Sequence, residues 1–94
     1  MIRLDPAAIA FSRQAWAEYR YWTQHDRAVA RRIARLIARL IEECLRDPAH
    51  GVGKPEPLKH ELAGYWSRRI TKEHRLVYRV AKGRCVVVQC RYHY

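Results

Sequence analysis

Three side chains in the second half of the chain are of types that together can cleave RNA. Cleavage through the 2′-hydroxyl needs a base that removes its proton, a cation that stabilises the charged phosphorane, and an acid that protonates the 5′ leaving oxygen. Glu56 offers a carboxylate on a loop stiffened by a proline on each side, Arg75 is a permanent cation, and His93 titrates near neutral pH. Each is also an ordinary solvated surface residue when considered singly. Residue types and spacing therefore leave a metal-independent ribonuclease as one option.

The charge of the chain favours a negatively charged partner. Nineteen lysine and arginine residues face nine aspartate and glutamate residues, which gives a net charge of +10, and 15 of the basic residues are arginine. Residues 48–94 carry +7 of this charge and residues 1–47 carry +3. Arginine presents a planar fork of donors that fits phosphate. The second half is thus typical of a surface for a polyanion or for an acidic protein, and charge alone does not separate the two.

The sequence offers no pattern for a metal ion, a nucleotide or a serine nucleophile. The three cysteines, Cys44, Cys85 and Cys90, include no C-x-x-C pair, so neither a zinc site nor a disulfide framework is predicted. Gly53-Lys54 is similar to the end of a Walker loop, but a proline stands where that loop needs Ser or Thr. H-E-x-x-H and G-x-S-x-G patterns are absent. We expect no metal, no cofactor, and cysteines that are reduced and buried.

A long connection carries Glu56. From Asp47 to about Ala63 the hydrophobic periodicity stops, while glycine and proline recur. We expect one loop there, without a helix or a central strand. Connections longer than about 12 to 15 residues are uncommon in compact domains and are often functional, so this segment is a candidate site.

A first helix is predicted after Ser12, which has the residue type of an N-cap. It carries aromatic residues at steps of three, namely Trp16, Tyr19 and Trp22. We expect these rings to pack in the core, with stacking on nucleic-acid bases as the alternative.

A second helix is expected from about Asp26 to Arg46, because apolar residues recur there on one face. Another face of this helix carries Arg31, Arg35 and Arg39. Such a stripe fits either a solvated face or a contact with nucleic acid.

A mainly antiparallel sheet is predicted after the loop. Strand-forming residues dominate three segments separated by short turns, at Gly64–Ile70, Arg75–Val80 and Cys85 to Tyr92 or beyond. Ile9–Phe11 is expected to be a short first strand. In the middle segment arginines alternate with apolar residues, and Arg69 can point the same way as Arg75 across the turn, so arginines gather on one side of the sheet. The predicted fold class is α+β, with two N-terminal helices packed on the sheet in a single domain over residues 1–94.

The second half resembles the YoeB branch of the RelE-like toxins almost residue for residue. Residues 51–94 contain K-P-E-P-L-K, then W-S-R-R-I-T, E-H-R-L-V-Y and a terminal R-Y-H-Y. The spacing of the aromatic residues in the first helix is similar as well. The chain departs from the family pattern by an N-terminal extension and by a longer second helix near Leu40 to Cys44.

This resemblance implies a RelE-like fold and an endoribonuclease toxin that cuts messenger RNA in the ribosomal A site and so inhibits translation. It implies that Glu56 is the general base, that Arg75 steadies the phosphate and that His93 is the general acid. Tyr94 would orient the substrate or stack on it. Roles in binding RNA or phosphate fall on Lys59, His60, Arg69 and Arg91, and contacts with the ribosome on Arg31, Arg35 and Arg39.

The implied partners are the ribosome with its message, an antitoxin with an acidic segment similar to YefM, and a second copy of the chain. No apolar run approaches the roughly 20 residues of a membrane span, and the start lacks the apolar stretch of a signal peptide, so we expect a cytoplasmic protein. Two other classes stay open: a non-catalytic nucleic-acid-binding co-repressor that acts with its antitoxin, and a pure interaction protein. The co-repressor would need the arginines of the second helix but neither Glu56 nor His93, and the interaction protein would cause no loss of RNA.

Overall fold

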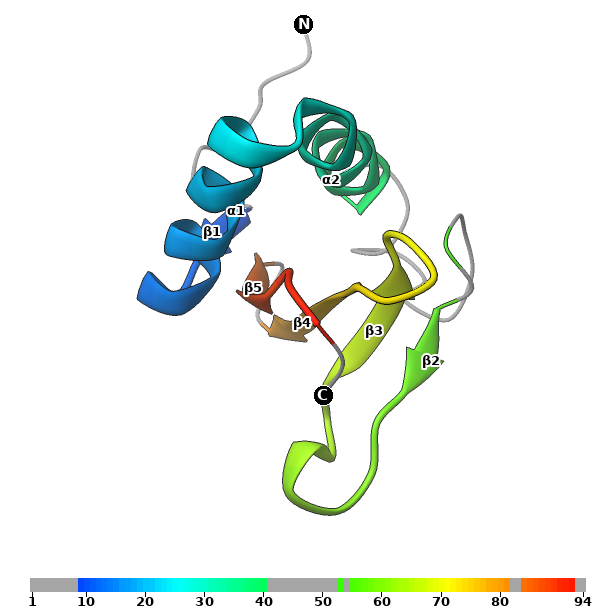
Figure 1. The fold of residues 1–94 in the computed structure, drawn as a ribbon. Helices are drawn as coiled ribbons and strands as arrows, with labels where there is room; N and C mark the ends of the chain where they lie inside the picture. Colours follow the sequence, from blue (N-terminus) through cyan, green and yellow to red (C-terminus); the bar gives the residue numbers. More distant parts are fainter. Residues whose placement is uncertain (1–8, 41–52, 54, 82–83, 93–94) are drawn as a thin grey trace, which may run out of the picture.

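The protein consists of two helices on one side of a five-stranded sheet (Figure 1). The computed structural model describes residues 9–40, 53, 55–81 and 84–92. The elements follow in the order β1 (Ile9–Phe11), α1 (Arg13–His25), α2 (Arg27–Arg39), β2 (Glu56–Pro57), a short 3₁₀ helix (His60–Leu62), β3 (Trp66–Arg69), β4 (Arg75–Ala81) and β5 (Arg84–Gln89). In the sheet the strands lie in the order β1-β5-β4-β3-β2, with only β1 and β5 parallel among these pairs. The predicted α+β fold class is confirmed.

Both helices begin at polar caps. Ser12 accepts a hydrogen bond from the backbone N–H of Ala15 at 3.0 Å, as its residue type predicted. Asp26 ends α1 and also starts α2, since one of its carboxylate oxygens accepts from the N–H groups of Ala28 and Val29 at 3.1 and 3.2 Å. Each cap satisfies backbone donors that have no partner inside the helix. The predicted continuation of the second helix over residues 41–46 lies outside the described residues.

The core lies between the helices and the sheet. Its fully buried members include Ile33 in α2 and Leu40, the residue that caps the end of α2. The sheet contributes Leu76, Tyr78 and Val87. The prediction that the aromatic rings of α1 pack in the core is confirmed for Trp22 and wrong for Trp16, which is 51% exposed. Three residues advance a helix by 300°, so rings at steps of three drift around the axis and cannot all face the same core.

Two of the three cysteines are buried and free, as predicted: Cys85 and Cys90. Cys44 lies outside the described residues. The last strand is shorter than predicted, because it ends at Gln89. After that point the chain bonds to α1 instead, since Cys90 N donates to Glu18 Oε1 at 2.8 Å and Trp22 Nε1 donates to the Cys90 carbonyl at 2.9 Å.

The segment that was expected to be one loop contains a short strand. β2 pairs antiparallel with β3, with Glu56 opposite Ser67 and Pro57 opposite Trp66. The two residues form the edge of the sheet, where a proline is tolerated because it needs to donate no bond on the open side. Among the described residues of this segment, 53 and 55–63, the one strand is at the sheet edge. The prediction of one continuous loop is wrong for β2 and for the 3₁₀ helix that follows it.

Candidate active site

The sheet face turned away from the helices brings together most of the polar residues of the candidate site. Directly opposed residues on antiparallel strands point to the same face. Glu56 is opposite Ser67, and Arg69 is opposite Arg75. Their neighbours Arg68 and Leu76 also oppose each other and point to the other face, where Leu76 is part of the core. The predicted gathering of arginines on one side of the sheet is therefore confirmed for Arg69 and Arg75.

Arg75 and Glu56 form the centre of this face. Arg75 Nη2 lies 4.0 Å from Glu56 Oε1, and the Arg75 side chain is 11% exposed while that of Glu56 is 51% exposed. Arg75 Nε donates to the Ser67 hydroxyl at 2.8 Å, and Ser67 is fully buried. The cation is thus held in place by a buried acceptor, whereas the carboxylate is open to solvent. A half-exposed ion pair at this distance contributes little to the stability of the fold, on the order of 0–1 kcal/mol. Its importance would therefore be that it places a carboxylate and a cation side by side.

The C-terminal segment meets this face at Arg75. The Tyr92 carbonyl accepts a hydrogen bond from Arg75 N at 3.1 Å, and Tyr92 N donates to His74 Nδ1 at 2.7 Å. His93 and Tyr94, which the resemblance assigns to the reaction, lie outside the described residues. The described part of the chain therefore ends at the backbone of Arg75.

Lys59 and His60 lie next to Glu56. Both are exposed, and together with Glu56, Pro57 and Leu58 they line a hollow of about 360 Å³. His60 adopts a left-handed backbone conformation with φ of 59° at the start of the 3₁₀ helix. A lysine and a histidine at a hollow that includes the carboxylate suit the binding of a phosphate group beside Glu56.

Arg91 packs on aromatic rings of α1 and of the C-terminal segment. Its guanidinium stands 3.7 Å from the centroid of the Tyr21 ring and 4.6 Å from that of Tyr92. Its Nε is buried and has no hydrogen-bond partner among the described residues. Cation–π contacts of this kind fix a guanidinium in place, so Arg91 joins the C-terminal segment to α1.

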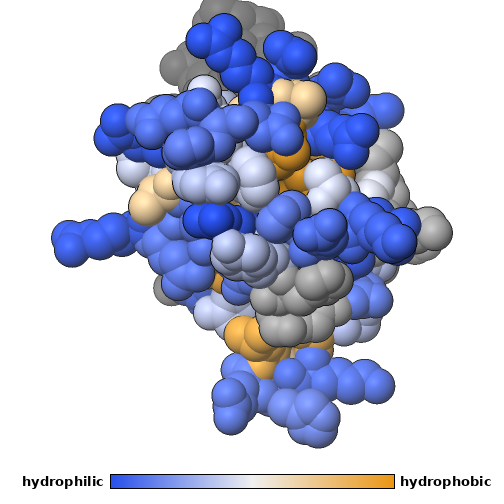
Figure 2. Space-filling model, in the orientation of Figure 1, coloured by the Kyte–Doolittle hydropathy of each residue, from blue (hydrophilic) through white to orange (hydrophobic). Residues whose placement is uncertain are grey.

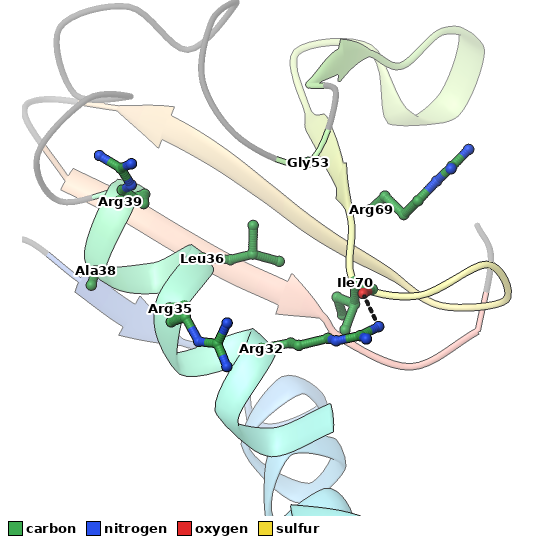
Figure 3. A pocket seen from close by; sticks show the side chains of 8 residues that line it. All are labelled: Arg32, Arg35, Leu36, Ala38, Arg39, Gly53, Arg69 and Ile70. Atoms are coloured by element: carbon green, nitrogen blue, oxygen red, sulfur yellow. Dashed lines mark hydrogen bonds between the residues drawn. The ribbon is translucent and has the colours of Figure 1, made fainter. Parts of the chain in front are cut away.

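The arginines of α2 lie at other hollows. Arg35 and Arg39 line a cavity of about 600 Å³ between α2 and β3, with Leu36 and Ile70 also in its lining (Figure 3). Arg31 borders a different hollow, which it shares with residues of α1. In Figure 3 the Arg69 side chain points away from α2. Arg69 nevertheless also lines the cavity of Arg35 and Arg39, whereas Glu56 and Arg75 are not among its lining residues.

Two features are absent from the part of the chain that the structure describes. There, no group of three or more His, Cys, Asp or Glu side chains is placed to hold a metal ion. None of the described helices has the length and apolar character needed to cross a membrane.

Comparison with known proteins gives the family. The family model of YoeB-like toxins of bacterial type II toxin–antitoxin systems matches residues 11–94. The chain belongs to the YoeB-like toxin family. Toxin YoeB of Streptomyces coelicolor is 54% identical over 86 residues, which are 92% of this chain and 98% of that protein.

Solved structures of the family agree with the fold. The YoeB dimer from Staphylococcus aureus has a TM-score of 0.83 at 40% identity, covering 96% of this chain and all of that chain. The YoeB–YefM complex from the same organism has a TM-score of 0.82 at 40% identity over 99% of this chain and all of that chain. The expected RelE-like architecture is therefore confirmed together with the family.

Sequence reasoning missed two residues of this site, Ser67 and His74. Ser67 alternates with Arg69 along its strand, and this spacing was a signal that the hydroxyl shares the face of the arginine. No local pattern marks His74, because its contact with Tyr92 joins positions 18 residues apart.

Proposed function

We propose that this protein is an endoribonuclease toxin that cleaves messenger RNA in the ribosomal A site and thereby inhibits translation. The observation that carries the proposal is the Glu56 and Arg75 pair, with Oε1 and Nη2 4.0 Å apart on the sheet face opposite the helices. A base and a fixed cation at this separation can act on neighbouring atoms of one phosphodiester. Membership of the YoeB-like toxin family supports the same reading.

In the proposed mechanism, Glu56 removes the proton of the 2′-hydroxyl. The hydroxyl oxygen then attacks the adjacent phosphorus, and the 5′ oxygen leaves as it takes a proton from an acid. The exposure of Glu56 lets the substrate hydroxyl reach its carboxylate. Arg75 stabilises the negative charge that develops on the phosphorane oxygens, and its bond to Ser67 keeps it aligned without reorganisation during the reaction. No metal ion takes part in these steps.

His93 is proposed as the acid and Tyr94 as the residue that orients the substrate. Their support is the position of the residue before them, since Tyr92 is bonded to the backbone of Arg75. Lys59, His60 and Arg69 are proposed to bind flanking phosphates because they lie around the pair. Arg91, which packs on Tyr21, is proposed to act on RNA only through the remaining donors of its guanidinium.

The proposed partners are the ribosome, an antitoxin and a second copy of the chain. Solved relatives from Staphylococcus aureus are a YoeB–YefM complex and a YoeB dimer. An antitoxin with an acidic segment would complement the exposed Arg69 and the net charge of +10. The ribosome requires that the protein act in the cytoplasm, and Arg31, Arg35 and Arg39 are proposed to contact ribosomal RNA there.

The decisive experiment maps RNA 5′ and 3′ ends after induction, with translation running and with translation blocked. The wild-type protein should produce new ends within translated messages and lose this activity when translation stops. A double Glu56→Gln, His93→Gln variant should produce none. Glu61→Gln is the matched control, because Glu61 is exposed on the neighbouring 3₁₀ helix and has no proposed role.

The outcomes separate this proposal from its alternative. Equal cleavage of translated and naked transcripts at the same protein concentration contradicts dependence on the ribosome. Loss of RNA that persists in the double variant contradicts the assigned roles. Absence of any RNA loss, together with antitoxin-dependent binding to operator DNA that requires Arg31, Arg35 and Arg39, would instead support the non-catalytic co-repressor.

A further inference from the structure

The chain end is tied to the rest of the molecule by a short series of specific contacts. Cys90 is fixed to α1 by two backbone bonds, since its N–H donates to Glu18 and its carbonyl accepts from Trp22. Arg91 packs over the Tyr21 ring. Tyr92, the last described residue, is held by the turn between β3 and β4 instead. The path of the segment is therefore set by α1 first and by that turn at its end.

Tyr92 has an unusual backbone that two hydrogen bonds hold. Its φ is 64°, in the left-handed region that costs a non-glycine residue about 1 kcal/mol. Its N–H donates to His74 Nδ1 at 2.7 Å and its carbonyl accepts from Arg75 N at 3.1 Å. The consecutive residues His74 and Arg75 thus bond to the N–H and to the carbonyl of Tyr92. Only the bond to His74 involves a side chain.

The His74 imidazole is itself fixed. Trp22 meets the ring edge-on with centroids 4.7 Å apart, and the Tyr92 ring lies 5.5 Å away on a tilted plane. The His74 backbone is fixed as well, since its carbonyl accepts from two N–H groups of the turn and its N–H donates to Thr71 Oγ1 at 3.2 Å. A ring held in this way presents Nδ1 in one direction. Accepting a bond there requires a neutral ring with its hydrogen on Nε2.

We propose that His74 is a positioning residue, which acts through Tyr92 to set where the chain end leaves Arg75. His74 does not touch the substrate in this proposal. Its imidazole replaces the acceptor that a neighbouring strand would supply, and so holds Tyr92 in the conformation that keeps its carbonyl on Arg75 N. The consequence for cleavage rests on the proposed function, because it assumes that the residues after Tyr92 react. The structural part does not rest on it.

The experiment compares three full-length variants with the wild type. His74→Leu removes the acceptor and keeps an apolar side chain against Trp22. His74→Asn restores an acceptor, because the Asn Oδ1 stands the same number of bonds from Cα as the His Nδ1. His25→Leu is the control, because His25 also stacks on an aromatic ring, that of Tyr21 at 4.3 Å, and has no assigned role at the chain end.

Two readouts are recorded for each protein: hydrogen exchange of the Tyr92 amide by NMR, and single-turnover cleavage of messenger RNA on ribosomes at saturating protein. In His74→Leu we expect the Tyr92 amide to exchange about tenfold faster and cleavage to slow by about fivefold to tenfold, with unchanged affinity for ribosomes. His74→Asn should restore most of both values. His25→Leu should match the wild type in both.

Equal Tyr92 exchange in the wild type and in His74→Leu overturns the proposal, as does a His74→Asn variant that restores neither readout. Faster exchange with unchanged cleavage by an active enzyme overturns the positioning role. If the wild type cleaves no RNA, the proposed function fails, while the exchange data still decide whether His74 holds Tyr92. Should His74→Leu not fold, the imidazole nitrogen shifts of the wild type decide: a hydrogen on Nδ1 at neutral pH overturns the proposal.

Discussion

At the scale of single residues, the candidate site combines a fixed cation, Arg75, with an accessible carboxylate, Glu56. Arg75 is mostly buried and bonded to Ser67, while half of the Glu56 side chain is exposed. A fixed cation lowers the reorganisation needed to stabilise a transition state, and an accessible carboxylate can reach a substrate proton. If the proposed function holds, removing Ser67 should therefore affect cleavage without removing either of the two groups proposed to react.

Ser67→Ala tests this dependence. We expect cleavage to slow by about tenfold, because the Arg75 guanidinium loses a buried acceptor worth roughly 1 kcal/mol or more. Arg75→Ala should slow it by about 10²-fold to 10³-fold. The double variant should be no slower than Arg75→Ala alone, since Ser67 acts only through Arg75. Single-turnover rates of the four proteins on ribosomes measure this, and additive losses would contradict the arrangement.

Cys90 gives a prediction about pH. Burial, and secondly the nearby Glu18 carboxylate, raise the pKa of the Cys90 thiol from 9.0 to about 12. The folded protein therefore keeps this proton in a range where the unfolded chain has lost it, so the stabilisation is complete below about pH 9 and declines as the pH rises toward about 12. The expected slope for one proton is about −1.4 kcal/mol per pH unit in the free energy of unfolding.

Urea unfolding of the wild type and of Cys90→Ala at pH 8, 9, 10 and 11 measures this slope. The variant should be less stable at pH 8, because it loses buried sulfur in the core. The free energy of unfolding of the variant should fall less steeply above about pH 9, because only the wild type has the Cys90 thiol, whose proton the unfolded chain loses there. Parallel curves for the two proteins would rule out a contribution of Cys90.

At the scale of elements, the position of Glu56 depends on how β2 is held at the sheet edge. Besides its pairing with β3, this part of the chain is tied by Gly53, whose carbonyl accepts from Arg69 N at 2.6 Å. Gly53 has φ of 84°, and a Cβ there would lie 3.1 Å from both Arg68 Cβ and the Arg69 carbonyl oxygen. A side chain at this position would push the approach to β2 away from β3.

Gly53→Ala should therefore destabilise the protein by about 2 kcal/mol and slow cleavage, since both the backbone conformation and the close contact are unfavourable. Gly64→Ala is the matched control, because Gly64 has a similar φ of 93° with no atom within 4 Å of the added Cβ. It should cost only about 1 kcal/mol. Thermal unfolding and cleavage rates of the pair measure the difference, and equal losses would show that the close contact is unimportant.

At the scale of the whole molecule, the net charge of +10 should govern encounter with RNA. The surface in the view of Figure 2 is largely hydrophilic over the helices and the sheet. Exposed arginines lie on α1 as well as on α2, so charge alone does not say which helix would face the proposed ribosomal partner. The cavity between α2 and β3 favours the Arg35 and Arg39 side.

Salt dependence distinguishes the two helices. Affinity for ribosomes should fall as salt rises, and an Arg35→Gln, Arg39→Gln variant should reduce the slope of log affinity against log salt by about 1.5, since each lost phosphate contact accounts for about 0.7 to 0.9. An Arg13→Gln, Arg20→Gln variant removes the same charge from exposed positions of α1 and should change the slope much less. Equal changes in the two variants would assign the effect to net charge.

Features that depend on neighbouring residues could be predicted from the amino-acid order alone. The apolar face of α2, the caps at Ser12 and Asp26 and the alternation in β4 were all readable, because helix and strand periodicities depend only on spacing along the chain. The same local information predicted that Arg69 and Arg75 share a face. The family motifs, being contiguous, indicated Glu56 and Arg75 before the structure placed them together.

Contacts between residues far apart in the sequence could not be predicted and became visible in the folded chain. The pairing of β2 with β3, the bond from Arg75 to Ser67 and that from Tyr92 to His74 all join separate segments. The exposure of Trp16 likewise depends on how α1 sits on the sheet. Strand register and helix docking result from packing over the whole core, and a local pattern is compatible with several registers. The geometry of the site therefore follows from the fold, while its chemistry was already present in the residue types.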